Sequence, residues 1–160
     1  MRCISRFSDI TIRRRMLVIC DIDDTVFCYG KEIEEYWKSK IEDPNYRIWM
    51  SIVERVNPKL TDNNIHQFIK DVIDNEGDFH FVTHRNKLFK EITTRHLREN
   101  NLHGLPVHFL TGSSKGDYIN NNFHEKTYNE VIFIDDSEVN IRDVETKVSN
   151  STNYKFEKFR

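Results

Sequence analysis

Hydrophobic and polar residues alternate along the chain in blocks that predict strands and helices in turn. Short, uninterrupted apolar runs are typical of strands buried on both faces, and apolar residues at every third or fourth position are typical of helices. Strands are expected at residues 15–20, 78–83, 107–110, 131–134 and 154–156. Helices are expected at 31–56, where Pro44 breaks an irregular pattern, and at 60–76, 86–101, 114–123 and 137–148. This alternation predicts an α/β fold with a central parallel sheet and helices on both faces.

The clearest helical pattern lies between Leu60 and Gly77. Thr61 is a suitable N-cap and Gly77 a suitable stop signal. The apolar face at spacing i, i+3, i+4, i+7 and i+8 consists of Ile65, Phe68, Ile69, Val72 and Ile73. In the helix at 86–101, the inward residues are expected to be Leu88, Ile92 and Leu97.

Length and composition fit a single folded domain. The chain has 160 residues, 38% hydrophobic and 31% charged, and a formal net charge of −2, so no global basic field points to nucleic acid. Residues 1–14 are expected to form a basic lead-in before a domain at 15–160. Both ends are basic, through Arg13, Arg14, Arg15, Lys155, Lys158 and Arg160. These ends are either solvated flanks or a patch for a phosphate polymer, and nucleic acid stays open as a partner.

The cysteines and the apolar runs predict a reducing, cytoplasmic setting. Cys3, Cys20 and Cys28 are an odd number without a short-spaced framework, which argues against a disulfide scaffold. No apolar run reaches the roughly 18 residues of a membrane span. The N-terminus lacks the apolar core of a signal peptide.

Polar residues with chemical potential follow four of the predicted strands. Because the carboxyl ends of parallel strands meet at one edge of a sheet, these side chains are expected to lie close together. They are Asp21, Asp23, Thr83, Lys115, Asp135 and Asp136. Carboxylates at the end of a buried strand repel one another and lose water, so such a cluster indicates a bound cation or chemistry.

These residue types suit phosphate-ester hydrolysis. Asp21 can act as the nucleophile, and Asp23, two residues on, can serve as general acid and then as base. The Thr83 hydroxyl and the Lys115 ammonium are suitable donors to the phosphoryl oxygens. Mg²⁺ would remove the repulsion between carboxylate and phosphate, with Asp135 and Asp136 completing its site.

The pattern resembles the haloacid dehalogenase (HAD)-like phosphohydrolase superfamily, which is Rossmann-like and Mg²⁺-dependent. Leu17–Thr25 matches the first motif, hhhhDxDxT, and Phe81–Thr83 matches the second, a strand ending in Ser or Thr. Lys115 matches the third motif, and Phe133–Asp136 matches the fourth, an acidic pair after a strand. The likeness covers roughly residues 15–145, in order as well as content, and implies a HAD-like phosphatase domain at 15–160.

The resemblance also implies a ligand set for Mg²⁺. Asp21, the main-chain carbonyl of Asp23 and Asp136 would be direct ligands, with Asp135 beside them. Within the superfamily, the motifs look most like the acid phosphatases with four signature aspartates. In these the fourth motif often has a further Asp about four residues on, where this chain has Asn140.

Three residues beside these motifs carry open interpretations. His84 is expected to join Thr83 and Lys115 in binding the substrate phosphate, or to lie in a solvated loop. Arg85 either faces substrate or forms a salt bridge. Asp24 either caps the turn after the first strand or supports the site. Phe27, Tyr29, Tyr36, Trp37 and Trp49 are expected to be mostly core, with Phe27 and Tyr29 able to line the site's mouth.

The spacing of the motifs leaves room only for a small insert. Thr25 and Thr83 are 83 − 25 = 58 positions apart, enough for a helical insert at about 30–58, and Thr83 and Lys115 are 115 − 83 = 32 apart. HAD-like enzymes recognise small substrates through larger insertions at these points. An open site is therefore expected, with either a bulky substrate, such as a phosphoprotein or a nucleic-acid end, or a partner subunit that closes it.

The favoured function is a Mg²⁺-dependent phosphomonoesterase that forms an aspartyl-phosphate on Asp21. A small-molecule or nucleotide phosphatase and a non-catalytic HAD-fold binding protein are the alternatives, although the latter typically loses the nucleophile. A signalling receiver domain uses similar residues, but its acidic pair comes first and its Lys last. The sequence indicates neither the oligomeric state nor the substrate.

Overall fold

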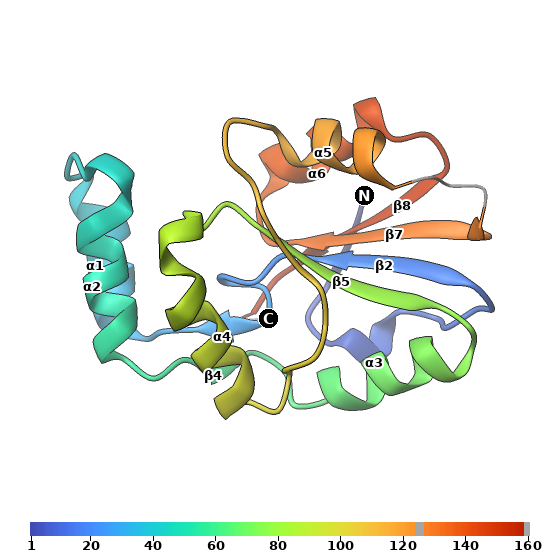
Figure 1. Cartoon of the computed structure of the whole chain (residues 1–160), viewed down its shortest axis with the longest axis horizontal. Helices are drawn as coiled ribbons and strands as arrows, with labels where there is room; N and C mark the ends of the chain where they lie inside the picture. The colour runs from blue at the N-terminus through green and yellow to red at the C-terminus, as the bar shows by residue number, and fades with distance from the viewer. Residues whose placement is uncertain (124–126, 159–160) are drawn as a thin grey trace.

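The computed structural model describes residues 1–123 and 127–158, and a six-stranded parallel sheet lies at their centre (Figure 1). Its strands, in chain order, are β1 (Arg2–Ile4), β2 (Met16–Cys20), β5 (Asp78–Thr83), β6 (Val107–Phe109), β7 (Glu130–Asp135) and β8 (Ser151–Phe156). Across the sheet the order is β1-β8-β7-β2-β5-β6, and all neighbours are parallel. This is the predicted Rossmann-like HAD fold.

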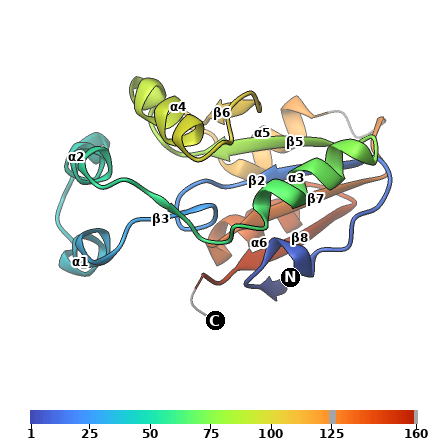
Figure 2. The same cartoon turned by 90° about the horizontal axis from the view of Figure 1, so that it is seen from below.

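The central strands are apolar throughout because both of their faces are covered. In β2, Val18 and Cys20 pack in one hydrophobic cluster, and Leu17 and Ile19 pack in a second. The first cluster contains residues of α3 (Ile65–Asp74) and α4 (Lys90–Glu99), and the second contains residues of α5 (Lys115–Asn122) and α6 (Glu138–Lys147). Figures 1 and 2 show the two helix layers on opposite sides of the sheet. The prediction of helices on both faces is confirmed.

A helical insert, residues 30–58, projects from the sheet between two short antiparallel strands. These strands are β3 (Phe27–Cys28) and β4 (Lys59–Leu60). The insert contains α1 (Lys31–Ser39), the 3-10 turn η2 (Pro44–Tyr46) and α2 (Arg47–Arg55), so the break at Pro44 lies where the sequence predicts it. In Figure 1 the two helices lie side by side at one end of the molecule.

The N-terminal segment, expected as a lead-in, contributes to the sheet. β1 pairs in parallel with β8, and the short 3-10 helix η1 (Phe7–Asp9) follows it. The Phe7 ring is fully buried and stacks on Phe156 with centroids 5.1 Å apart. A three-residue strand whose partner lies about 150 residues away along the chain leaves little local signal.

The basic residues near the ends are largely engaged with acidic groups. Arg14 forms a salt bridge with Glu76 at 3.0 Å, and Lys158 pairs with Asp24 beside the candidate site. These pairs favour the interpretation of the ends as flanks of the fold. Arg160 lies outside the described residues. None of the described helices is long and apolar enough to cross a membrane.

Two helix predictions need correction. α3 begins at Ile65 rather than near Leu60, because Leu60 belongs to β4 and the Thr61 hydroxyl donates to the Thr25 carbonyl instead of capping a helix. Ile73 at its end is half exposed. Leu88 points to solvent rather than inward, because the 3-10 turn η3 (Lys87–Phe89) precedes α4 and changes the helical phase.

Candidate active site

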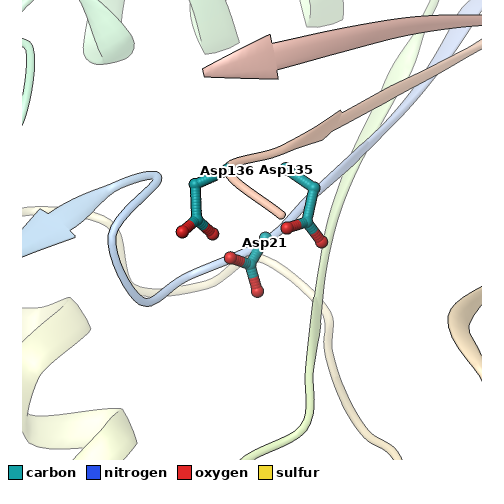
Figure 3. A group of neighbouring side chains, drawn as sticks. All are labelled: Asp21, Asp135 and Asp136. Atoms are coloured by element: carbon teal, nitrogen blue, oxygen red, sulfur yellow. The ribbon is translucent and has the colours of Figure 1, made fainter. Parts of the chain in front are cut away.

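Three carboxylates meet beyond the carboxyl ends of the two central strands. Asp21 follows β2, Asp135 ends β7 and Asp136 comes next (Figure 3). Oxygens from all three lie within 4.8 Å of one another. In the sheet, β5 and β6 lie on one side of β2, and β7 and β8, which come later in the chain, lie on its other side. The three carboxylates therefore lie at the point where the strand order reverses. Parallel sheets bind ligands at such points.

Lys115 forms ion pairs with two of these carboxylates. Its Nζ lies 2.6 Å from Asp21 Oδ1 and 2.7 Å from Asp135 Oδ2, and the side chain is buried. Burial disfavours the ammonium, but the two carboxylates outweigh this and raise the Lys115 pKa. The Asp21 pKa is also raised, first by burial and then by Asp135, while Lys115 opposes the shift. Lys115 therefore stays charged and compensates one of the three negative charges.

Thr25 connects Asp21 to the third carboxylate. Its hydroxyl lies 3.0 Å from Asp21 Oδ2 and 3.3 Å from Asp136 Oδ1. Burial, followed by repulsion from Asp135, raises the pKa of Asp136 to about 6. Asp136 therefore holds its charge with little compensation from the protein.

The trio fits a small divalent cation. Both oxygens of Asp135 accept from protein donors, which are Lys115, the Ser137 N–H at 2.9 Å and the Asn140 side-chain amide at 3.2 Å. The Asp21 and Asp136 carboxylates lie next to each other, and carboxylate oxygens are the ligands that Mg²⁺ prefers. The neutral Asn140 thus supports Asp135 at the place where the resembling acid phosphatases often have another Asp.

Asp23 lies in a different network, built around Arg85. The Arg85 side chain is buried, and its Nε and Nη2 atoms lie 3.0 Å from Oδ2 and 2.7 Å from Oδ1 of Asp23. The Tyr29 hydroxyl also donates to Asp23. The paired carboxylate raises the Arg85 pKa although burial opposes the charge. Of the two interpretations of Arg85, the salt bridge is the one that the structure confirms.

The loop after β5 presents Thr83 and His84 to the same space. The buried Thr83 hydroxyl accepts from the Arg85 backbone N–H at 3.0 Å, which leaves its proton for another acceptor. His84 lies at the rim, where partial burial and then the Lys115 ammonium lower its pKa. A neutral imidazole can offer one hydrogen bond but no charge.

Asp24 and the turn before β3 fix the position of Asp23. Asp24 adopts a left-handed backbone conformation with φ of 64°, its N–H bonds the Phe27 carbonyl at 2.8 Å, and its carboxylate pairs with Lys158. Left-handed conformations favour Asp and Asn among non-glycine residues. Asp24 therefore acts in the turn, as one of its two interpretations predicts.

A cavity of about 150 Å³ opens beside these groups. Asp21, Asp23 and Thr83 line its floor. Its walls include Trp37, Tyr46, Trp49, Met50 and Phe89, most of them from the helical insert. The expectation that Trp37 is core is wrong, because half of this side chain is exposed. The sequence also gave no indication of Tyr46 and Phe89, since their direction depends on how the insert folds back.

Three solved structures have similar folds, each at TM-scores near 0.6. A class C acid phosphatase from Bacillus anthracis has a TM-score of 0.60 and 12% identity, over 95% of this chain and 70% of that one. The Legionella pneumophila effector Ceg4 has a TM-score of 0.56 and 12% identity, over 94% of this chain and 91% of the effector chain. A chain of the Pnkp1/Rnl/Hen1 complex has a TM-score of 0.56 and 17% identity. That match covers 90% of the present chain but only 48% of the chain in the complex. At such low identity the likeness establishes the fold.

Comparisons of sequence give less. Residues 106–160, less than half of the chain, match a family described as a protein of unknown function (DUF2608). No match was found among curated proteins.

Proposed function

We propose that this protein is a Mg²⁺-dependent phosphatase that hydrolyses a phosphomonoester through an aspartyl-phosphate on Asp21. The observation that carries the proposal is the position of Asp21. It ends a buried central strand, contacts Lys115, neighbours Asp136 and lines the same cavity as Asp23. A buried carboxylate that an ammonium holds in place and that lines a cavity is suited to attack phosphorus.

The residues divide the reaction between them. An Asp21 oxygen attacks phosphorus, and the bond from phosphorus to the ester oxygen breaks as Asp23 gives that oxygen a proton. Asp23 then takes a proton from the water that attacks the aspartyl-phosphate, which releases phosphate and restores Asp21. The Thr83 hydroxyl, with His84 at the rim, donates to the phosphoryl oxygens. Lys115 holds Asp21 in place and balances its charge.

Asp21 and Asp136 would hold Mg²⁺, with the main-chain carbonyl of Asp23 and with Asp135 in support. When bound, the ion would offset the negative charge of the carboxylates and of the phosphate. The proximity of the Asp21, Asp135 and Asp136 carboxylates supports this ligand set, as does the presence of a single ammonium, that of Lys115, to compensate them.

The similar structures support the class of reaction, since the Bacillus anthracis protein is named as an acid phosphatase. The substrate is less constrained. The expectation of a bulky substrate rested on an open site, but side chains of the insert line the cavity and reduce its width. A non-catalytic binding role is disfavoured because Asp21, Asp23 and Lys115 are all present and in contact with suitable partners.

Hydrolysis of p-nitrophenyl phosphate with and without Mg²⁺ tests the proposal. Turnover should require Mg²⁺, stop with EDTA and return with added Mg²⁺, whereas Ca²⁺ should restore little because its coordination is larger and looser. Asp21→Asn should abolish turnover with the fold intact by circular dichroism, and Asp24→Asn, which keeps the turn, should remain active. Full activity after chelation, or in Asp21→Asn, would contradict the proposal.

A further inference from the structure

The walls of the cavity above Asp21 and Asp23 are unusually aromatic. Trp37, Tyr46 and Trp49 come from the helical insert, and Phe89 comes from the loop after β5. The insert rings form a connected series, with centroids 6.5 Å apart for Trp37–Tyr46 and for Tyr46–Trp49. Trp37 and Tyr46 are 50% and 52% exposed. Large rings left half in water around a cavity indicate a surface that an apolar group covers.

The walls of the cavity offer little to a second charged group. Arg85 is the strongest cation among its lining residues, and Asp23 already neutralises it at 2.7 Å. His84 has a lowered pKa because of burial and of Lys115, so it adds no charge near neutral pH. A second phosphate, as in a nucleic-acid end, would find no free counter-charge on these walls. The surface therefore selects for an uncharged group next to the phosphate.

The cavity has room for an aromatic ring. Its volume of about 150 Å³ is similar to that of an engineered protein cavity known to bind benzene. Trp49 closes one side, with its ring 5.6 Å from the Arg85 guanidinium. The Trp49 indole N–H is buried and has no hydrogen-bond partner among the described residues.

We propose that the substrate is an aryl phosphate, in which the phosphate is esterified to a single phenolic ring that packs against Trp37, Tyr46 and Trp49. This rests on the proposed phosphatase function and specifies its substrate class. The bond between phosphorus and the phenolic oxygen breaks, Asp21 takes the phosphoryl group, and the phenolic oxygen takes its proton from Asp23. Such a ring occurs in free aryl phosphates and in phosphorylated tyrosine side chains.

Binding can be measured without turnover, because both tryptophans of the chain line the cavity. Phenylphosphonate and methylphosphonate, which are not hydrolysed, are titrated with Mg²⁺ present while tryptophan fluorescence is followed. Phenylphosphonate should change the fluorescence and bind about tenfold more tightly or better, given the energy of aromatic contacts plus buried area. Trp37→Ala and Tyr46→Ala should remove most of that difference. Ile41→Ala and Ile48→Ala, exposed on the same insert but outside the cavity, should not.

Kinetics then distinguish the sources of the ring. Phenyl phosphate and a tyrosine-phosphorylated peptide should each have a higher kcat/KM than glycerol phosphate, and Trp37→Ala should reduce this preference mainly by raising KM. A peptide preferred over phenyl phosphate identifies the protein source, and the reverse identifies the free ester. Equal affinity for the two phosphonates, or a preference for nucleoside monophosphates, would overturn the aryl assignment. Selective phenylphosphonate binding without hydrolysis of any ester would keep the aromatic site and reject the phosphatase.

Discussion

Two carboxylates only two residues apart have different surroundings in this site. Asp21 contacts Lys115 and Thr25, next to Asp135 and Asp136, whereas Asp23 contacts Arg85 and Tyr29. The turn with Asp24 at positive φ separates the two side chains. Asp21 therefore lies within the acidic trio, and Asp23 lies outside it in an ion pair with Arg85. This difference supports separate roles as nucleophile and as proton carrier.

Asp23→Asn tests the proton carrier. With no acid for the leaving oxygen, hydrolysis of alkyl phosphates should fall by about 10²–10⁴-fold, the usual contribution of general acid–base catalysis. The phosphorylating step with p-nitrophenyl phosphate should fall much less, because its leaving group is a weak base. The aspartyl-phosphate should then persist, which acid quench and mass spectrometry can detect.

The matched control for Asp23→Asn is Asp24→Asn. It removes a neighbouring carboxylate of the same turn without touching the Arg85 pair, so it should leave both substrate types nearly unchanged. Equal losses on alkyl and p-nitrophenyl phosphates in single turnover, with no phospho-enzyme, would make Asp23 a structural residue.

His96 should make stability depend on pH. It is buried, its pKa is lowered to about 4 by burial and then by Arg85, and a histidine in the unfolded chain titrates near 6.5. Between these values the unfolded chain binds more protons, so the free energy of unfolding falls as the pH drops from 6.5 to 4. The slope from one such group approaches about 1.4 kcal/mol per pH unit. Above pH 7 it contributes no slope.

The raised pKa of Asp136 has the opposite effect, because protonation of this carboxyl at lower pH favours the folded state. The contribution of His96 is therefore measured as a difference in stability between the wild type and a His96 variant. Urea unfolding of the wild type and of His96→Gln is compared at pH 7.5, 6.0 and 5.0. The stability advantage of the wild type should shrink with acidification, whereas the exposed His103→Gln should track the wild type. A constant difference for His96→Gln would show that its protonation is not linked to folding.

At the scale of elements, Lys115 depends on how closely α5 approaches α6. Gly116 follows Lys115, and its N–H donates to Asp143 at 2.8 Å. A Cβ at Gly116 would lie 2.7 Å from the Asp143 backbone oxygen. Only glycine allows this contact, so the residue after the candidate lysine sets the distance between two helices.

Gly116→Ala should therefore affect both stability and activity. The helices must separate by several tenths of an ångström, at a cost of about 1–3 kcal/mol as for other overpacked sites. Lys115 would move with α5, so kcat should drop while KM changes little. Asn121→Ala, exposed on the same helix, serves as control and should be neutral in thermal unfolding and in turnover. Unchanged kcat in Gly116→Ala would show that Lys115 tolerates such movement.

The sequence predicted elements with strong local patterns and missed those fixed by distant partners. The strand at 78–83 and the break at Pro44 lie as predicted because apolar runs and proline act locally. β1 was missed because its pairing depends on β8. Leu88 was placed inward because a 3-10 turn cannot be told from a helical turn by periodicity alone.

At the scale of the whole molecule, the fold itself creates the candidate site. Asp21, Lys115, Asp135 and Asp136 were predicted together because parallel strands deliver their ends to one edge. A salt bridge of Arg85 was one of two interpretations, but its partner Asp23 could not be named, since 62 positions separate the two residues. The aromatic walls could not be inferred, because the packing of the insert, and not its composition, decides which rings face the cavity.

A cation bound by the acidic cluster would stabilise the entire chain. Without a cation, folding brings three carboxylates together with one ammonium, and Asp136 keeps a charge that burial and Asp135 disfavour. Mg²⁺ bound only by the folded state should stabilise it by RT ln(1 + [Mg²⁺]/Kd), about 2.7 kcal/mol at a hundredfold excess over Kd. The melting temperature should rise accordingly, by several degrees for a chain of this size.

Asp136→Asn should raise the melting temperature in the absence of a cation and should reduce the further rise that Mg²⁺ produces. In EDTA at pH 8 its melting temperature should exceed that of the wild type, because the neutral amide removes about 2 kcal/mol of repulsion and desolvation. Added Mg²⁺ should then raise the melting temperature little, since a ligand has been lost.

Two further variants serve as comparisons. Glu138 is a nearby acidic residue that pairs with Arg142, and Glu138→Gln should keep the full Mg²⁺ shift. Asp135→Asn should instead destabilise the protein with or without Mg²⁺, because Lys115 loses the more deeply buried of its two carboxylate partners. Differential scanning fluorimetry of the four proteins in EDTA and in Mg²⁺ gives the comparison, and an undiminished Mg²⁺ shift in Asp136→Asn would place the cation elsewhere.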